Sequence, residues 1–249
     1  MSLPAASKDR NNLLDVQPTP SAGKTKLTVS DVEKSFLSPS GGKIEVLKRV
    51  SFQAVAGESI AVMGASGAGK STLLNLLGGL ETVDRGVIVL DEYSIAGAKA
   101  QELAQIRNTR IGFVFQFHHL LPDLTAAENT ALPLMISGLS QKRAVELAIR
   151  ALEHVGLGER ASHPVSYLSG GEQQRVAVCR ALIAEPVLVL ADEPTGNLDA
   201  TIEDEISEHL VTYARNRPGI LIVATHNERL ARMCDRLLIL KDGILSSDN

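Results

Sequence analysis

Apolar and polar residues alternate along the first part of the chain, after about residue 25, in a way typical of strands. A loop at Ser38–Gly42 interrupts this region, and the alternating runs are Lys26–Val32, Lys43–Val46 and Val50–Ala54. Because a period of two places apolar side chains on one face of a strand, these runs predict an antiparallel sheet. The compact apolar run Ser59–Met63 predicts a further strand, which leads through a Gly-rich turn into a helix over Ser71–Leu77.

The middle of the chain follows the longer period of helices. Thr125–Glu128 has the spacing of a capping box, which marks the start of a helix. A second helix is expected over Lys142–Val155, with Gly156 and Gly158 marking its end. Its apolar face is expected to contain Val145, Ala148, Ala151, Leu152 and Val155.

The last third alternates helices with strands. After Ser169 a helix is followed by the strand Val187–Leu190, the helix Ile202–Asn216 and the strand Ile220–Ala224. This order predicts an α/β fold in which helices cover a parallel sheet, with the helical middle inserted as a separate subdomain. Residues 1–24 are rich in Ser, Pro, Asn and Lys without a sustained period, which predicts a flexible N-terminal tail.

The charge and composition of the chain argue against nucleic-acid binding and against a membrane-spanning segment. The 249 residues carry a formal net charge of −4, whereas a general affinity for nucleic acid usually needs a basic domain, so no direct nucleic-acid binding is expected. The N-terminus lacks the apolar core of a secretion signal, and apolar runs such as Pro186–Ala191 are too short for a bilayer of ~30 Å. We therefore expect a cytoplasmic protein whose membrane-spanning helices, if it needs any, belong to another polypeptide. Cys179 and Cys234 are expected to be reduced and packed among apolar residues.

The strongest chemical signal is a Gly-rich segment between the strand Ser59–Met63 and the following helix. It satisfies G-x-x-x-x-G-K-[ST], a phosphate-binding loop in the context that the motif requires. Its glycines let backbone N–H groups approach a phosphate chain, and the helix N-terminus adds a positive dipole. A simple turn would explain the glycines but not the Lys-Ser pair at this spacing. The residues expected at the nucleotide are Gly64, Ser66, Gly67, Ala68, Gly69, Lys70, Ser71 and Thr72.

An acidic pair follows the strand Val187–Leu190. Asp192 and Glu193 would lie at the carboxyl edge of a parallel sheet, where ligands of open α/β sheets bind. Asp192 would hold Mg²⁺, and Glu193 would polarise the attacking water. Such a pair can also be an ordinary loop start, and only the phosphate-binding loop beside it favours the functional interpretation.

The segment Leu168–Arg175 is a second candidate site for an anion. Ser169 and Glu172 have capping-box spacing, and Gly170 and Gly171 leave N–H groups uncovered at the start of a helix, which suits an anion. A well-capped helix without a ligand would look the same. At this point, however, the sequence resembles the signature motif of the ABC (ATP-binding cassette) ATPases.

Other motifs of that family follow in order. Phe115–Gln116 resembles the Q-loop, Gly196–Asp199 the D-loop, and Thr225–His226 the switch histidine at the end of a strand. Phe36 is found where the family has an aromatic residue that stacks on adenine; the usual residue there is Tyr, so the stacking face is kept and the hydroxyl is lost. The resemblance covers roughly Leu27 to Ile244.

The resemblance implies a P-loop NTPase (RecA-like) core, an N-terminal antiparallel β subdomain and an inserted helical subdomain at about 97–171, all within a cassette over 25–249. It also implies ATP and Mg²⁺ as ligands, with Mg²⁺ held by Ser71, Gln116 and Asp192. The catalytic residues would be Glu193, His226 and Gln116.

The resemblance further implies a head-to-tail homodimer. ATP would lie between the phosphate-binding loop of one subunit and Ser169, Gly170 and Gly171 of the other, with Asp199 also at the nucleotide. No internal repeat is visible in the sequence, so one chain holds one half of each site.

A transmembrane permease is the other partner that the resemblance implies. The run Phe117–Leu124, directly after Gln116, is unusually apolar for a loop. An exposed apolar patch there would suit a permease, whereas the same side chains could equally pack inside the helical subdomain.

The segments Phe115–Asn129 and Ala191–Asp199 resemble the branch of the family that drives lipoprotein release at the inner membrane, and less closely the macrolide-exporter and cell-division branches. The implied location is the cytoplasmic face of the inner membrane. Two interpretations from other classes remain: a soluble ABC protein of DNA repair or chromosome upkeep, and an ATP switch without hydrolysis. Long coiled-coil insertions and zinc cysteines are absent from the sequence, and Glu193 and His226 argue against the switch.

Overall fold

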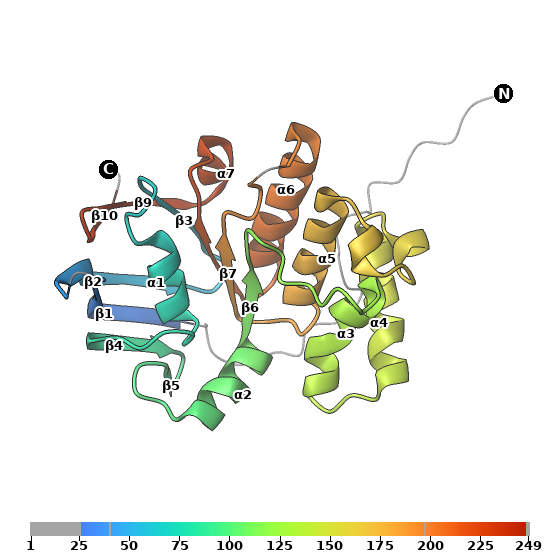
Figure 1. The fold of residues 1–249 in the computed structure, drawn as a ribbon, viewed down its shortest axis with the longest axis horizontal. Helices are drawn as coiled ribbons and strands as arrows, with labels where there is room; N and C mark the ends of the chain where they lie inside the picture. The colour runs from blue at the N-terminus through green and yellow to red at the C-terminus, as the bar shows by residue number, and fades with distance from the viewer. Residues whose placement is uncertain (1–25, 40, 197, 248–249) are drawn as a thin grey trace.

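The computed structural model describes residues 26–39, 41–196 and 198–247, so the predicted tail of residues 1–24 lies outside it. The chain forms two sheets and seven α-helices within the described residues (Figure 1). The strands are β1 Lys26–Leu37, β2 Lys43–Val55, β3 Ser59–Met63, β4 Arg85–Leu90, β5 Tyr93–Ser94, β6 Ile111–Val114, β7 Leu188–Asp192, β8 Ile220–Ala224, β9 Arg236–Lys241 and β10 Ile244–Ser247. The helices are α1 Lys70–Leu77, α2 Ala100–Arg110, α3 Ala126–Ile136, α4 Gln141–His154, α5 Gly170–Leu182, α6 Ala200–Asn216 and α7 Glu228–Met233.

The larger sheet has the strand order β10-β9-β3-β8-β7-β6, and all its pairs are parallel except β10 with β9. The predicted parallel core is therefore confirmed. Consecutive residues of β7 and β8 point to opposite faces, and both faces are covered by apolar side chains. Leu188 and Leu190 pack with α1 on one face, while Val189 and Ala191 pack with α5 and α6 on the other. This burial on both sides explains why these strands are continuously apolar in the sequence.

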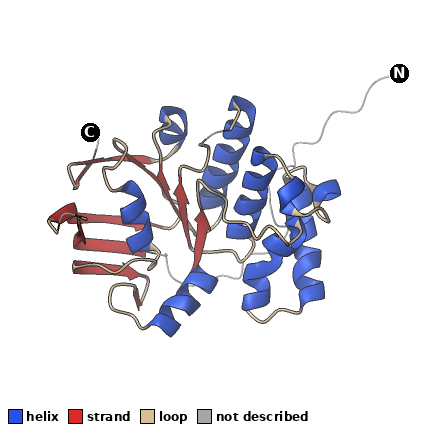
Figure 2. Cartoon of the chain, in the orientation of Figure 1, coloured by secondary structure: helices blue, strands red, loops and turns tan. Residues whose placement is uncertain are grey.

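The smaller sheet is antiparallel, as predicted, with the order β2-β1-β4-β5. It lies on the other side of α1 from the parallel sheet, at the left of Figure 2. The three predicted runs belong to two longer strands: the first lies in β1, and the other two are joined in β2. Bulges in the β1–β2 pair let these strands continue through positions where apolar and polar residues do not alternate. Sequence reasoning also missed β4, whose apolar residues Val87–Leu90 form an unbroken run although only Ile88 and Leu90 are buried.

A separate hydrophobic core joins α3, α4 and α5, away from the two sheets. The capping box predicted at Thr125 is confirmed, and Ser169 has one of the same type at the start of α5. The α4 helix is also confirmed, shifted by one residue at each end, and its buried face is Ala144, Ala148, Ala151 and Leu152. Val145, predicted on that face, is only half buried. The predicted boundaries of the inserted subdomain, about 97–171, stay a prediction.

No helix in the described part of the chain has the length and apolar character needed to cross a membrane. Both cysteines are free, as predicted. Burial raises the pKa of Cys179 to about 12 and that of Cys234 to about 11, which leaves neither thiol reactive at neutral pH.

Candidate functional site

A cavity of about 620 Å³ opens where the parallel strands end. This edge of the sheet is where open α/β folds bind ligands. All but one of the lining residues were predicted from the sequence. The residues are Phe36, Val46, Ser66, Gly67, Gly69, Lys70, Ser71, Thr72, Gln116, Asp192, Glu193 and His226.

The phosphate-binding loop depends on glycine at two positions. Gly67 and Gly69 have φ values of 78° and 103°, which side chains rarely tolerate. A Cβ on Gly69 would also lie only 2.9 Å from Val46 Cγ1. Because α1 begins directly after Gly69, the N–H groups and positive dipole end of that helix are positioned at the cavity.

The ammonium of Lys70 lies inside the cavity. Its Nζ donates hydrogen bonds to the carbonyl oxygens of Gly64 at 2.9 Å and Ala65 at 3.3 Å, and it lies 3.9 Å from Glu193 Oε1. A phosphate oxygen is a stronger acceptor than a carbonyl because it carries charge. The ammonium can therefore exchange these contacts for a phosphate that enters the cavity.

Glu193 is held in a strained conformation. Its φ is +45°, and the residue before a proline normally prefers extended backbone, so this conformation needs support from its surroundings. The backbone N–H donates to Ala224 O at 2.8 Å. Glu193 Oε2 accepts hydrogen bonds from Thr225 Oγ1 and His226 N, each at 3.2 Å, and lies 2.9 Å from His226 Nδ1. The carboxylate is thus fixed between the ends of β7 and β8.

Asp192 has the features of a cation ligand. Burial raises the pKa of its carboxyl, while a hydrogen bond with Ser71 and the charge of Lys70 oppose that shift. Its Oδ1 is buried and has no hydrogen-bond partner in the structure as described. A buried, unpaired carboxylate oxygen beside a serine hydroxyl suits Mg²⁺, which binds one or two protein oxygens and completes its shell with water and phosphate. No cluster of three or more His, Cys, Asp or Glu suited to a metal occurs among the described residues.

Phe36 on β1 and Gln116 in the loop after β6 line the same cavity. The Phe36 ring is 40% exposed, and Lys34 Nζ lies 5.0 Å from its centroid. Gln116 comes two residues after β6. The structure therefore brings both predicted residues to the phosphate-binding loop, although they lie 80 residues apart in the sequence.

The other predicted residues lie outside this cavity. Gly64 and Ala68 belong to the phosphate-binding loop but face a neighbouring hollow beside β9. Ser169 caps α5, and Asp199 caps α6 by accepting a hydrogen bond from Ile202 N at 3.1 Å. Ser169 and Gly170 are exposed, whereas Gly171 is buried against Ile202. No residue of the signature motif contributes to the cavity of its own chain.

Comparison with known proteins decides the family. A model described as ABC transporter matches residues 47–196, which is more than half of the chain. The chain belongs to the ABC transporter family. The lipoprotein-releasing system ATP-binding protein LolD of Legionella pneumophila (strain Paris) is 44% identical over 88% of this chain and 96% of its own. The protein of the same name from Idiomarina loihiensis is 45% identical over 89% of this chain and 97% of its own.

Solved ABC structures share the fold. The ATP-binding cassette MJ0796, in a dimeric post-hydrolysis state with ADP and Pi, aligns with a TM-score of 0.84 and 35% identity. The match covers 90% of this chain and 98% of that one. A second dimeric structure of MJ0796 gives a TM-score of 0.83 at the same identity and coverage. The P-loop NTPase core predicted for this ABC chain is therefore confirmed.

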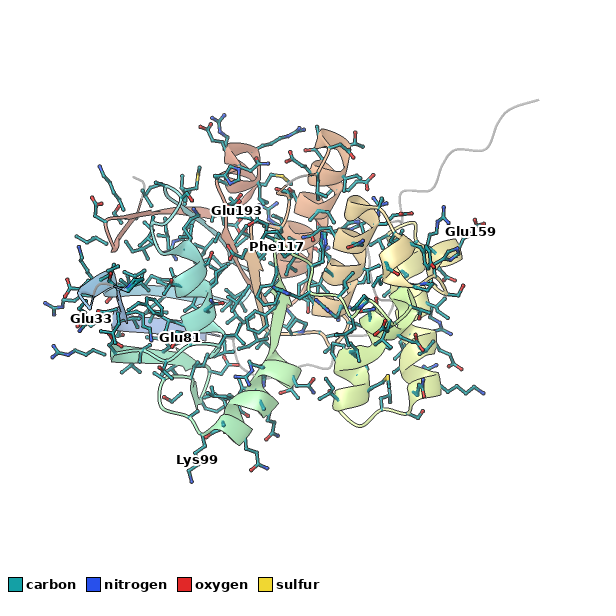
Figure 3. All side chains as sticks on the ribbon, viewed as in Figure 1. Glu33, Glu81, Lys99, Phe117, Glu159 and Glu193 are labelled. Carbon is teal, nitrogen blue, oxygen red and sulfur yellow. The ribbon has the colours of Figure 1, made fainter. Side chains whose placement is uncertain are left out.

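The apolar loop of this ABC chain, residues 117–124, combines both interpretations left open by the sequence. Leu120 is half buried and packs on the helical core, while Phe117 is 73% exposed and Leu121 48% exposed. Figure 3 labels Phe117, which directly follows Gln116 of the cavity lining, and Glu193, which lines that cavity. The loop backbone is held by two side chains. Arg180 donates to the carbonyls of His118 and His119, and buried Asn129 bonds to the N–H and carbonyl of Leu121.

Sequence reasoning missed Val46 as a lining residue. Its pattern on β2 is that of an ordinary strand valine, and only the pairing of β2 with β1 brings it beside Phe36. The left-handed backbone conformation of Glu193 was also not predicted, although Pro194 after it indicates that the backbone there is restricted.

Proposed function

We propose that this chain binds and hydrolyses ATP as the peripheral subunit of an ABC transporter that releases lipoproteins from the inner membrane. The observation that carries the ATPase assignment is the convergence of the phosphate-binding loop, Asp192, Glu193 and His226 on one cavity. The assignment to lipoprotein release rests on the LolD relatives, which align over nearly their whole length.

In this proposal the adenine stacks on Phe36, with Val46 beside it. The phosphates lie on the glycine loop and the N-terminus of α1, where Lys70, Ser71 and Thr72 face them. Ser71, Asp192 and Gln116 would hold Mg²⁺, which supplies charge neutralisation at the phosphate oxygens.

Hydrolysis in this proposal depends on two side chains at the ends of β7 and β8. Glu193 accepts a hydrogen bond from the attacking water and orients it towards the terminal phosphate. His226 contacts that phosphate, and its short distance to Glu193 Oε2 keeps the two groups in one arrangement. Because both groups are fixed by the sheet, they need little reorganisation before reaction.

The second half of each site comes from another copy of the chain. Ser169 and Gly170 are exposed at the N-terminus of α5, outside their own cavity, so they are free to meet a nucleotide bound to a partner subunit. The dimeric MJ0796 structures support a pairing of two cassettes. Asp199 is exposed at the start of α6 and would lie in the same interface.

The Ser169→Arg variant is expected to bind ATP normally but to lose most of its turnover. The larger side chain replaces a cap hydroxyl at the surface that meets the partner's nucleotide, while the cavity of the same chain is unchanged. Loss of the N-cap alone costs about 1 kcal/mol, so the variant stays folded. Titration with a fluorescent ATP analogue and a steady-state ATPase assay test this. Full turnover in the variant would exclude α5 from the site.

The membrane partner is expected to contact the exposed side chains of the loop after Gln116. Phe117 and Leu121 are exposed apolar side chains of one loop, and Phe117 directly follows Gln116 of the cavity lining, so a permease helix bound there would respond to changes at Gln116. The hydrogen bonds with the side chains of Arg180 and Asn129 fix the backbone of this loop, so little ordering of the loop is needed before such contact.

Replacing Phe117 and Leu121 with Ser is therefore expected to weaken assembly with the permease while leaving the melting temperature and isolated ATPase activity almost unchanged. Leu120→Ser is the matched control. It should instead lower stability by about 1 to 3 kcal/mol, because a half-buried leucine loses part of its packing. Pull-down from membranes, a thermal melt and an ATPase assay separate the two effects. A large drop in melting temperature for the double variant would show that its side chains are core.

The macrolide-exporter and cell-division branches are the alternative assignments. Co-purification of the intact chain from membranes, followed by identification of the bound permease, distinguishes the three branches. Recovery of a permease of another branch would overturn the lipoprotein assignment but not the ATPase assignment.

A further inference from the structure

Gln174 links the signature helix to the catalytic turn. It lies in the second turn of α5, five residues after Ser169, and its side chain is 2% exposed. Its Nε2 donates a hydrogen bond of 2.6 Å to the carbonyl oxygen of Pro194, the residue directly after Glu193. The bond joins α5 to the end of β7.

The bond from Gln174 stabilises the backbone at Glu193 and Pro194, which has an unfavourable conformation. Glu193 has a left-handed φ immediately before a proline, and such a conformation persists only when several contacts impose it. On one side its N–H is bonded to Ala224 O in β8, and its carbonyl accepts from Gly196 N at 3.1 Å. Pro194 has no N–H, so its carbonyl is the one polar group through which that residue can be tied, and Gln174 holds it.

A glutamine side chain is energetically unfavourable at this buried position. Within the residues that the structure describes, Gln174 Oε1 is buried without a hydrogen-bond partner, and an unpaired buried acceptor usually costs about 1 to 3 kcal/mol. An apolar side chain of similar size would fill the space without that cost. The amide is therefore explained by its N–H bond to Pro194 and not by packing.

We infer that Gln174 is a positioning residue for Glu193: it fixes the Glu193–Pro194 peptide and so aims the carboxylate at the attacking water. This inference rests on the proposed ATPase function. Because α5 also carries Ser169 at its N-terminus, about 7.5 Å away at ~1.5 Å per residue, a shift of the helix on contact with a partner's nucleotide would reach Glu193 through this bond.

The chain offers a matched control at the other end of the same strand. Glu185 also has a positive φ before a proline, and Tyr213 donates a buried hydrogen bond of 3.0 Å to the carbonyl of Pro186. Neither residue lines the cavity. Gln174→Met and Tyr213→Phe therefore each remove one buried side-chain bond to a proline carbonyl that flanks β7.

Steady-state kinetics of the full-length variants test the inference. Gln174→Met should lower kcat by about 10- to 100-fold, because a small displacement of the Glu193 carboxylate from the attacking water slows the reaction. KM and the affinity for ATP should be unchanged. Tyr213→Phe should keep the kcat of the unaltered chain, although it lowers the melting temperature as much or more. If Gln174→Met keeps its kcat, or if both variants lose activity only in proportion to stability, the inference is wrong.

Two further measurements keep the outcome clear. Gln174→Leu, which also lacks the donor, replaces the Met variant if that protein does not fold, and the same loss of kcat is expected. The unaltered chain and Glu193→Gln are assayed beside them. An inactive unaltered chain would refute the proposed ATPase itself, whereas an active chain with an unaffected Gln174 variant refutes only the positioning role.

Discussion

The Glu193→Gln variant should bind ATP as well as the unaltered chain and hydrolyse it at least ~100-fold more slowly, because general base catalysis commonly contributes about 10²- to 10⁴-fold. The amide keeps the shape of the carboxylate, so the bonds from Thr225 Oγ1 and His226 N can still be made to its oxygen. It cannot accept the proton of the attacking water in the same way. A phosphate-release assay gives the turnover, and titration with a fluorescent ATP analogue gives the affinity.

Glu185→Gln is the control for that substitution. Glu185 has the same left-handed backbone before a proline but pairs with Arg217 Nη1 at 2.8 Å, away from the cavity. It should keep normal turnover. Normal hydrolysis by Glu193→Gln would remove Glu193 from the catalytic role.

Lys70→Ala is expected to weaken ATP binding by at least about 30-fold, because removal of one partner of a buried charged contact typically costs about 2 to 5 kcal/mol. The Lys70 side chain is almost fully enclosed, and its ammonium provides a full positive charge in a site otherwise built from backbone dipoles and the helix end. Equilibrium titration of the variant measures the loss.

Lys48→Ala controls for the general effect of removing a positive charge. Lys48 is exposed beside the neighbouring hollow and does not line the cavity. Its substitution should leave the affinity for ATP unchanged. Equal affinities for the Lys70 variant and the unaltered chain would mean that ATP binds elsewhere.

Local signals in the sequence predicted most of this site. The phosphate-binding loop and the acidic pair each lie at the end of an apolar strand, and parallel strands bring their carboxyl ends to one edge. Lys70, Asp192 and Glu193 could therefore be expected at one edge of the sheet, because the motif that contains each of them directly follows a strand of the same parallel sheet. Capping at Thr125 and Ser169 was equally local, since the bonds connect residues three apart.

Features that depend on contacts between distant segments were not predictable. β4 contains an unbroken apolar run, so the alternation that marks a half-buried strand was hidden. Val46 reaches the cavity through the register of β2 on β1, and Gln174 reaches Pro194 across 20 residues. Leu120 and Leu121 are adjacent in the sequence yet differ in burial, since Leu120 packs on the helical core while Leu121 is exposed and bonds to Asn129 through its backbone.

In the proposed dimer, each ATP site is completed by the signature helix of a second copy. Light scattering of Glu193→Gln with and without ATP, beside the double variant that also carries Ser169→Arg, tests it most directly. We predict that Glu193→Gln changes from monomer to dimer when ATP is added, and that the double variant stays monomeric although it still binds ATP. Dimers of the double variant at the same ATP concentration, or a Glu193→Gln protein that remains monomeric with ATP bound, would contradict the claim.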